Sequence, residues 1–339
     1  MLHLSAQGSR RRRQRPMLDQ VDKKLLNLLQ ADFPLVERPF QAVAGRLGLE
    51  QAEVLERASR LKEEGVIRQI SASCDAKKLG YKTTLVALHI AQPHLEKAAA
   101  VISKHPGVSH NYSRNHYFNL WFTLALPGSS DLNKVIQTLV RRARADDILI
   151  LPALKVFKLD TTFDLTGEGL PGSQQSPQPQ VKDYQLSAQD RPIINQLQEE
   201  LPLIERPFDG WATSLGIEVS ALLTNVQRLK QRGIVRRFGA SLAHTAVGLA
   251  ANAMICWQVP ITQVEETGRR LASFQWVSHC YERQTGPEWP FNLYTMVHQP
   301  TAESCREAVA RMSLETGINH YQILFTVKEY KKTRVKYLV

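Results

Sequence analysis

The spacing of apolar residues near the start of the chain predicts three short helices followed by a strand. Apolar side chains recur every three or four residues from Leu18 onward, and Asp19 is suited to cap the first helix. Gly48 and Gly65 follow the second and third apolar stretches, at positions where helices commonly end. The predicted helices begin near residue 18 and cover 41–47 and 50–64, and the strand covers 66–73. This order is typical of a winged helix-turn-helix unit.

The following residues alternate between strand and helix patterns in the order βαββαβ. Strands are predicted at 83–90, 108–113, 119–126 and 153–159, and helices at 95–104 and 130–144. This order is typical of the ferredoxin-like sandwich, in which helices cover one face of an antiparallel sheet. The same alternation returns between residues 250 and 328.

The chain contains its own pattern twice, which predicts an α+β protein made of two fused homologous subunits. The repeated motifs, in fixed order, are PLVERPF (34–40) and PLIERPF (202–208), GVIR (65–68) and GIVR (233–236), and HNYSR (110–114) and HCYER (279–283). A segment rich in Gly, Pro, Gln and Ser separates the copies. The expected domains are a disordered basic arm (1–16), a winged helix-turn-helix (17–75), a ferredoxin-like domain (76–165), a linker (166–183), a second winged helix-turn-helix (184–243) and a second ferredoxin-like domain (244–339).

Charge and cysteine content exclude several classes of protein. The net charge is +11, but five of the positive charges are arginines between residues 10 and 15, so the rest is only mildly basic. The four cysteines lie far apart without a CxxC pair, which disfavours a disulfide framework, a zinc ribbon or a cysteine-ligated iron–sulfur cluster. No stretch reaches the roughly 20 apolar residues of a membrane span, and the amino-terminal segment lacks the apolar core of a secretory signal. We therefore expect a cytoplasmic protein without membrane contact.

The third predicted helix occupies the DNA-recognition position but is poorly suited to DNA. Its three basic side chains face five acidic ones, and this net negative charge opposes contact with phosphates. The equivalent helix of the second copy is better suited, with Arg228, Lys230 and Arg232 against Glu218. Because only one of the two recognition helices has a charge suited to DNA, we expect no specific DNA partner. We expect the helix-turn-helix units to have a structural role.

The repeated PLxERPF segment has two interpretations that the residues leave open. Phe40 and Phe208 could pack the loop onto the sandwich domain, with each Glu paired to an Arg. Alternatively, Arg38 and Arg206 contact a ligand directly.

Two predicted strands carry the residues with the clearest chemistry. Period-two spacing places His110, Tyr112 and Arg114 on one strand face, and His279, Tyr281 and Arg283 on the equivalent face of the second copy. Imidazole, phenol and guanidinium groups together suit a large anionic, partly aromatic ligand. A solvated outer face is the alternative, and its repetition in both copies disfavours it. Nothing resembles a Walker loop, a GxGxxG fingerprint or a pyridoxal site.

A helix-turn-helix joined to a ferredoxin-like domain resembles the Lrp/AsnC family of transcription regulators. PLVERPF, YxRNHxxNLWF in the first copy and CYER…PFNLY in the second resemble the siroheme decarboxylases, Lrp/AsnC-like proteins that act as paired subunits. This resemblance implies that two acetate side chains of siroheme lose carbon dioxide, giving didecarboxysiroheme for heme d1 or siroheme-dependent heme synthesis. It implies siroheme with its iron as substrate and no further cofactor. A regulator that senses heme or siroheme on the same fold is the alternative. The fused copies are expected to form an intramolecular pseudo-dimer, and the sequence leaves open a homodimer or a complex with homologous subunits.

The resemblance and the residue types assign roles to particular side chains. The expected carboxylate clamps are Arg114 and Arg283, and the expected proton donors or iron-facing groups are Tyr112, His116, His279 and Tyr281. No metal site is expected in the protein itself, and His116 or His279 is expected to face the siroheme iron. Further substrate-binding candidates are Asn119, Asn292, Arg38 and Arg206, although the two asparagines would serve equally as hydrogen-bonding groups at strand ends. His110 is left out, because we expect it to bond neighbouring backbone. The second copy has no counterpart of His116, so we expect one productive site or a pocket shared by both copies.

Overall fold

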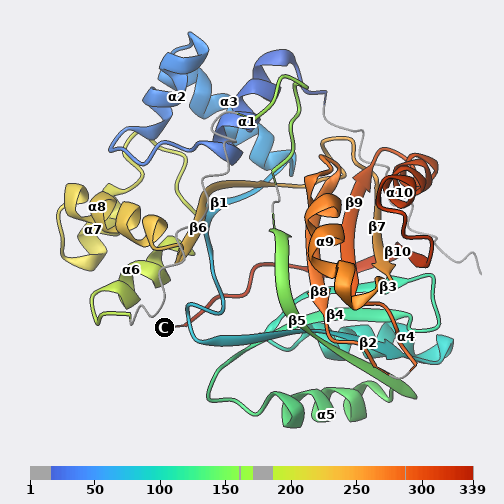
Figure 1. The fold of residues 1–339 in the computed structure, drawn as a ribbon. Helices are drawn as coiled ribbons and strands as arrows, with labels where there is room; N and C mark the ends of the chain where they lie inside the picture. The colour runs from blue at the N-terminus through green and yellow to red at the C-terminus, as the bar shows by residue number, and fades with distance from the viewer. Residues whose placement is uncertain (1–16, 160–161, 171–185, 287, 339) are drawn as a thin grey trace, which may run out of the picture.

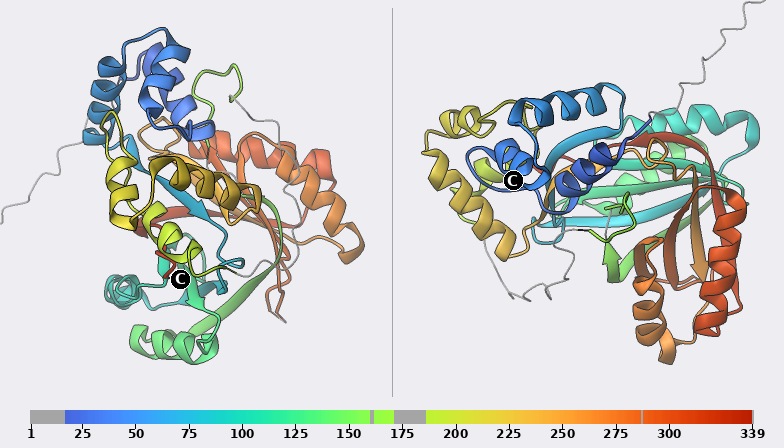
Figure 2. Two further views of the ribbon diagram at one scale, coloured as in Figure 1. Left: turned by 90° about the vertical axis from the view of Figure 1, so that its left-hand side faces the viewer. Right: turned by 90° about the horizontal axis from the view of Figure 1, so that it is seen from above.

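A computed structural model describes residues 17–159, 162–170, 186–286 and 288–338 (Figure 1). The expected amino-terminal arm and most of the expected linker lie outside these residues. The helix-turn-helix units lie together on one side of the molecule, and the strands of the second parts form the other side (Figures 1 and 2).

Each copy begins with three helices and a strand, as predicted. A capping box between Asp19 and Asp22 starts the first helix, and Gly48 in the left-handed conformation ends the second. The elements are α1 (Gln20–Ala31), α2 (Pro39–Leu47), α3 (Gln51–Glu63) and β1 (Ile67–Cys74), and in the second copy α6 (Asp190–Leu197), α7 (Asp209–Leu215), α8 (Val219–Gln231) and β6 (Val235–Leu242).

The two helix-turn-helix units share one hydrophobic core, because β1 and β6 pair with each other. They form an antiparallel ribbon, with Ser71 opposite Gly239. Gly239 has φ +154°, and a Cβ atom there would lie 2.5 Å from the carbonyl oxygen of Leu29 in α1. Glycine at this position therefore lets the ribbon approach α1 closely. The strand after each set of helices thus joins the two copies.

The PLxERPF segments join the same two units, which corrects one expectation. Phe40 and Phe208 are fully buried, but they pack in the shared helix-turn-helix core and not on the sandwich domains. The charged pairs are exchanged between copies: Arg38 lies 3.6 Å from Glu205, and Arg206 lies 2.9 Å from Glu37. Arg38 and Arg206 therefore lie at the surface between the two units, each paired with a carboxylate of the other copy.

The second part of each copy follows the predicted order βαββαβ. The elements are β2 (Tyr81–His89), α4 (Leu95–Ser103), β3 (Val108–Arg114), β4 (Leu120–Pro127), α5 (Leu132–Ala143) and β5 (Asp147–Leu159), and in the second copy β7 (Ala251–Trp257), α9 (Val264–Ser273), β8 (Val277–Arg283), β9 (Leu293–Gln299), α10 (Ala302–Thr316) and β10 (Tyr321–Lys332). The main difference from expectation is β5, which starts at Asp147 instead of residue 153.

β5 and β10 join the two sheets into one closed barrel, where two ferredoxin-like sandwiches associated as a pseudo-dimer were expected. The first half of β5 pairs with β2 of its own copy, and its second half pairs with β8 of the other copy. β10 pairs in the same way with β7 and then β3. The order around the barrel is β10-β3-β4-β2-β5-β8-β9-β7, and it closes on itself among the described strands. Helices α4, α5, α9 and α10 cover the outside (Figure 2).

Candidate functional site

The two predicted His–Tyr–Arg faces point into the barrel from opposite sides. β3 and β8 lie four positions apart in the strand order. Tyr112 and Arg114 are 8% and 5% exposed, so the alternative of a solvated outer face is wrong. The guanidinium carbon of Arg114 lies 5.6 Å from the Tyr112 ring centre, and that of Arg283 lies 4.8 Å from the Tyr281 ring centre. The shared faces predicted from period-two spacing are therefore present in both copies.

Arg114 and Arg283 each bond a strand of the other copy, and each has a buried Nε–H without a partner among the described residues. Arg114 donates from Nη1 to the carbonyl oxygen of Leu324 in β10 at 2.8 Å, and Arg283 donates to that of Leu151 in β5 at the same distance. The Nε groups of both arginines are buried and have no hydrogen-bond partner among the described residues. Burial lowers the pKa of Arg114 to about 10, so the side chain stays charged at neutral pH. Each arginine can therefore donate a further charged hydrogen bond to an anion inside the barrel.

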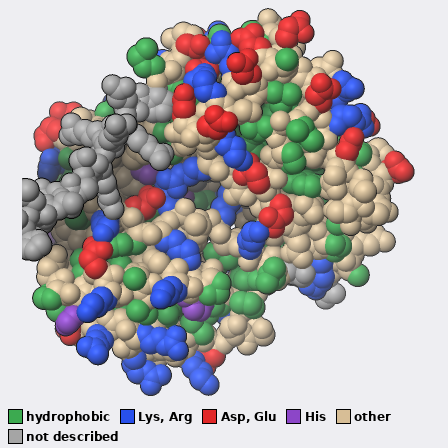
Figure 3. Space-filling model, turned by 180° about the vertical axis from the view of Figure 1, so that it is seen from behind, with side chains coloured by type: hydrophobic (Ala, Val, Ile, Leu, Met, Phe, Trp, Pro, Cys, Tyr) green, Lys and Arg blue, Asp and Glu red, His purple; other side chains and the backbone are tan. Residues whose placement is uncertain are grey.

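Basic side chains gather at the end of the barrel that meets the β1–β6 ribbon. Lys332 at the end of β10 stands opposite His110, and Leu159 at the end of β5 stands opposite His279. Arg68 of β1 contacts the carbonyl oxygen of Lys332, and Arg236 of β6 contacts that of Leu159. We call this group the basic cluster; its members are Arg68, Arg236, Lys332, His110, His279, His244 and His298. Figure 3 shows Lys, Arg and His side chains within a hollow on one face of the molecule.

Burial and mutual repulsion keep the histidines of the basic cluster neutral. Burial, followed by the charges of Lys332 and Arg68, lowers the pKa of His110 to about 4. Burial, followed by Lys332, His298 and Arg68, lowers the pKa of His244 to about 3. Burial, followed by Lys332 and Arg114, lowers the pKa of His298 to about 3. Burial also holds the pKa of His279 well below its ordinary value. Glu329, which lies 3.6 Å from Arg68, offsets only part of this positive charge.

A hydrogen-bonded chain links three side chains of the cluster in the second copy. The hydroxyl of Ser278 lies 2.7 Å from Nδ1 of His279 and 2.9 Å from Nε2 of His298. A β-bulge in β8 between Val277 and His279 places Ser278 there. In the first copy, His110 bonds the hydroxyl of Ser109 at 2.8 Å, whereas bonding to backbone was expected.

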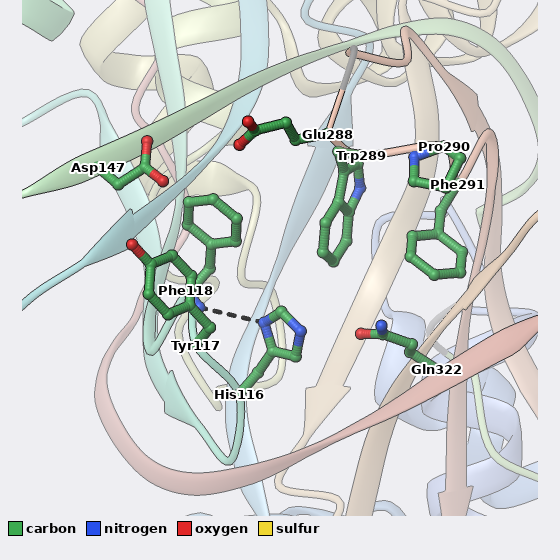
Figure 4. A pocket seen from close by; sticks show the side chains of 9 residues that line it. All are labelled: His116, Tyr117, Phe118, Asp147, Glu288, Trp289, Pro290, Phe291 and Gln322. Atoms are coloured by element: carbon green, nitrogen blue, oxygen red, sulfur yellow. Dashed lines mark hydrogen bonds between the residues drawn. The ribbon is translucent and has the colours of Figure 1, made fainter.

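His116 lies away from the basic cluster, in a pocket at the opposite end of the barrel. This pocket of about 350 Å³ lies near the start of β5 and β10 (Figure 4). Nδ1 of His116 accepts the backbone N–H of Phe118 at 3.1 Å, and burial lowers the pKa of His116. The carboxylates of Asp147 and Glu288 line the same pocket, so it is less suited to a polyanion than the basic cluster.

The loop of the second copy that replaces the His116 turn closes this end of the barrel. Trp289 is 3% exposed and packs against Trp121, Phe118 and Phe291, while its indole N–H bonds the hydroxyl of Tyr294. Trp121, Phe118 and Phe291 are therefore core residues. The two ends of the barrel thus differ: one is filled by aromatic rings and the other carries the basic cluster.

Asn119 and Asn292 join strand ends in equivalent ways. The side chain of Asn119 exchanges two hydrogen bonds with the backbone of Ile90, at 3.0 and 2.8 Å. Asn292 does the same with Val259, at 2.9 and 2.8 Å. Because these bonds engage both the oxygen and the nitrogen of each side-chain amide, Asn119 and Asn292 act as hydrogen-bonding groups at strand ends.

Sequence reasoning selected only His279 from the basic cluster; it left out His110 and did not single out the other five members. Arg68 and Arg236 stand at equivalent positions of the repeated GVIR and GIVR motifs, and this repetition was the signal that could have found them. His244, His298 and Lys332 belong to none of the repeated motifs, and only the fold brings the end of β10 beside His244, which lies against His298. Among the described residues, no group of three His, Cys, Asp or Glu side chains is placed to hold a metal ion.

Two family models match the chain in both copies. The model for the AsnC-like ligand binding domain matches residues 78–158 and 246–331. The model for the siroheme decarboxylase NirDL-like HTH domain matches residues 22–68 and 190–236. A siroheme decarboxylase from Hydrogenobacter thermophilus is 38% identical over 316 residues, which cover 93% of this chain and 94% of that protein.

The chain belongs to the siroheme decarboxylase family. A crystal structure of the siroheme decarboxylase NirDL with an iron-uroporphyrin III analogue matches this fold with a TM-score of 0.70 at 35% identity, covering 94% of this chain and 95% of that one. A siroheme decarboxylase beta subunit from Methanosarcina barkeri is 42% identical over 147 residues, covering 43% of this chain and 97% of that subunit. A whole subunit of the family therefore matches less than half of this chain, which confirms the fusion predicted from the repeats. In the described part of this family member, no helix is long and apolar enough to cross a membrane.

Proposed function

We propose that this protein is a siroheme decarboxylase that removes two acetate carboxyl groups from siroheme to give didecarboxysiroheme. The observation that carries the proposal is the basic cluster, where positive charge exceeds negative charge beside two inward-facing His–Tyr–Arg sets. Siroheme is a flat ring with carboxylates around its edge, and such a ligand offsets the cost of holding these cations together.

The substrate site that we propose is shared by both copies. Arg68, Arg236 and Lys332 bind the carboxylates at the rim, and the free Nε groups of Arg114 and Arg283 bind carboxylates that reach deeper into the barrel. Tyr112 and Tyr281 stay protonated, because burial raises the pKa of both phenols, and each can therefore donate a hydrogen bond or a proton. The neutral imidazoles of His110 and His279 supply groups that can face the iron or deliver a proton.

The macrocycle itself supports the chemistry of decarboxylation. When the carboxyl carbon leaves as carbon dioxide, the electron pair of the broken bond stays on the side-chain carbon next to the ring. The macrocycle then delocalises this electron pair. The protein has to orient the acetate and deliver one proton to that carbon. We assign the proton to His279, because it lies in the basic cluster and is hydrogen-bonded through Ser278, whereas His116 lies in the separate acidic pocket.

We infer that the helix-turn-helix units have a structural role, and that each copy is a winged helix-turn-helix followed by a ferredoxin-like domain within the expected boundaries. On α3, Arg57 and Arg60 both bond Asp22 of α1, and Arg228 of α8 bonds Asp190. These arginines are engaged within the protein, which supports the expectation of no specific DNA partner. The shared barrel supports an intramolecular pseudo-dimer, and a cytoplasmic location stays a prediction.

Anaerobic incubation with siroheme tests the proposed function. Mass spectrometry should show siroheme converted into a product that has lost two molecules of carbon dioxide. Siroheme that binds but stays unchanged, together with a defined DNA site at near-physiological salt, would instead support the regulator alternative.

A further inference from the structure

Among the described residues, only the second copy has a further histidine that contacts the serine of its Ser–His pair. His298 in β9 follows Val297, which stands opposite Val277. In the first copy, Val108 stands opposite Leu124, so Ala125 occupies the position equivalent to His298. Ser109 and Ser278 hold their neighbouring histidines in the same way, but the chain of hydrogen bonds continues beyond the serine in the second copy alone, within the described residues.

We propose that Ser278 and His298 form a proton relay that reloads His279 during decarboxylation. This inference rests on the proposed function. Ser278 lies within hydrogen-bond distance of both imidazoles, and His298 is only 8% exposed. Nδ1 of His298 is buried and has no hydrogen-bond partner among the described residues, so its lone pair can accept a hydrogen bond, and then a proton, from a water molecule that enters the barrel with the substrate. The His298 ring lies 5.3 Å from that of His244, which Lys332 contacts at 2.8 Å.

The relay balances protons and electrons with solvent water as the only further reactant. The bond between the acetate carbons breaks, carbon dioxide leaves, and the electron pair remains on the methylene carbon. That carbon takes the proton from Nε2 of His279, while Nδ1 of His279 takes the hydroxyl proton of Ser278. Ser278 takes the proton from Nε2 of His298, and Nδ1 of His298 takes one from water, which leaves as hydroxide into the solvent. Each carbon dioxide released therefore consumes one solvent proton, and no charge accumulates on the serine.

The position of His298 makes it a positioning and relay residue, and not one that touches the reacting carbon. His298→Ala should leave siroheme affinity within about twofold of wild type and lower kcat by about tenfold or more. The solvent deuterium isotope effect on kcat should rise, and added imidazole should restore part of the rate. A purely structural role for His298 would give no imidazole rescue.

Four further variants complete the test. His298→Gln keeps the bond to Ser278 but cannot shuttle a proton, so it should be as slow as His298→Ala while folding normally. Ser278→Ala should slow the enzyme to a similar extent, and the double variant should be no slower than either single one, because all break the same chain. Ser109→Ala breaks the equivalent bond in the first copy and should leave the isotope effect at its wild-type value.

The outcomes separate the relay from the proposed function. If wild-type protein does not release carbon dioxide from siroheme, the proposed function fails. If wild type is active and His298→Gln turns over at the wild-type rate, the relay is wrong. Additive losses in the Ser278 and His298 variants, or an equal change of the isotope effect in Ser109→Ala, would also overturn it.

Discussion

Replacement of Lys332 by methionine should make the protein more stable and a weaker binder of siroheme. Burial, followed by the charge of Arg68, lowers the pKa of Lys332 from 10.5 to about 8, and Glu329 partly opposes this. A lowering of the pKa by one unit corresponds to about 1.36 kcal/mol, so keeping Lys332 charged at pH 7 costs about 3 kcal/mol of folding free energy. The side chain is only partly buried, so solvent screening reduces this cost. Methionine also loses the bond to His244, worth about 1 kcal/mol. We therefore expect Lys332→Met to raise the free energy of unfolding by about 1–2 kcal/mol at pH 7.

The pH dependence gives this prediction a sign that can be checked. The folded protein loses the Lys332 proton near pH 8, whereas the unfolded chain keeps it until about pH 10.5. Wild-type stability should therefore gain from this group as pH rises through that interval, and the advantage of the variant should shrink. Urea unfolding followed by tryptophan fluorescence at pH 7 and pH 10 measures both values.

Siroheme affinity is the second readout of the same variant. Loss of a charged hydrogen bond to a carboxylate, worth about 1.5–3 kcal/mol, should weaken binding roughly 10–150-fold at pH 7. Lys328→Met is the matched control, because Lys328 lies on the same strand but is exposed and pairs with Glu96. The control should change stability and affinity only slightly. A Lys332→Met protein that is less stable than wild type at pH 7, or that binds siroheme equally well, would refute the reasoning.

Further predictions concern the roles of single residues, DNA and the fused halves. His279→Ala should lower turnover by about 10²–10⁴ while His116→Ala stays near wild type; the reverse result in a steady-state assay would place the acid in the His116 pocket. Arg283→Ala should lower the free energy of unfolding by about 1–3 kcal/mol in urea titrations, because it loses its bond across to β5, and an unchanged midpoint would contradict this. Fluorescence anisotropy should detect only weak DNA binding that salt abolishes, and a defined footprint near physiological salt would argue otherwise. The two copies, expressed as separate chains, should copurify, since each alone leaves the strands that pair across the barrel open; failure to associate would count against the shared barrel.

The sequence predicts local order well and long-range pairing poorly. Repeated motifs and apolar periods located the helix-turn-helix units and the βαββαβ order, because these depend on neighbouring residues. The extension of β5 back to Asp147 shows no clear alternation, and the second half of β5 pairs with β8 of the other copy, 120–130 residues further along the chain. The closed barrel could not be read from such a pattern.

The same limit explains which site residues were found. Tyr112 and Arg114 were placed correctly, because period two within one strand fixes their common face. His116 follows the same strand in sequence, yet it lies at the far end of the barrel with Trp289 of the second copy. His298 and Lys332 join the basic cluster only because strands of the two halves close around one interior.

The most direct test of the central claim is the position of the siroheme iron in crystals of this protein soaked or grown with siroheme, located by anomalous scattering at the iron edge. The account predicts iron at the basic cluster, between the His110 and His279 sides of the barrel, with substrate carboxylates on Arg68, Arg236 and Lys332. Iron in the pocket of His116, Asp147 and Glu288 would contradict it.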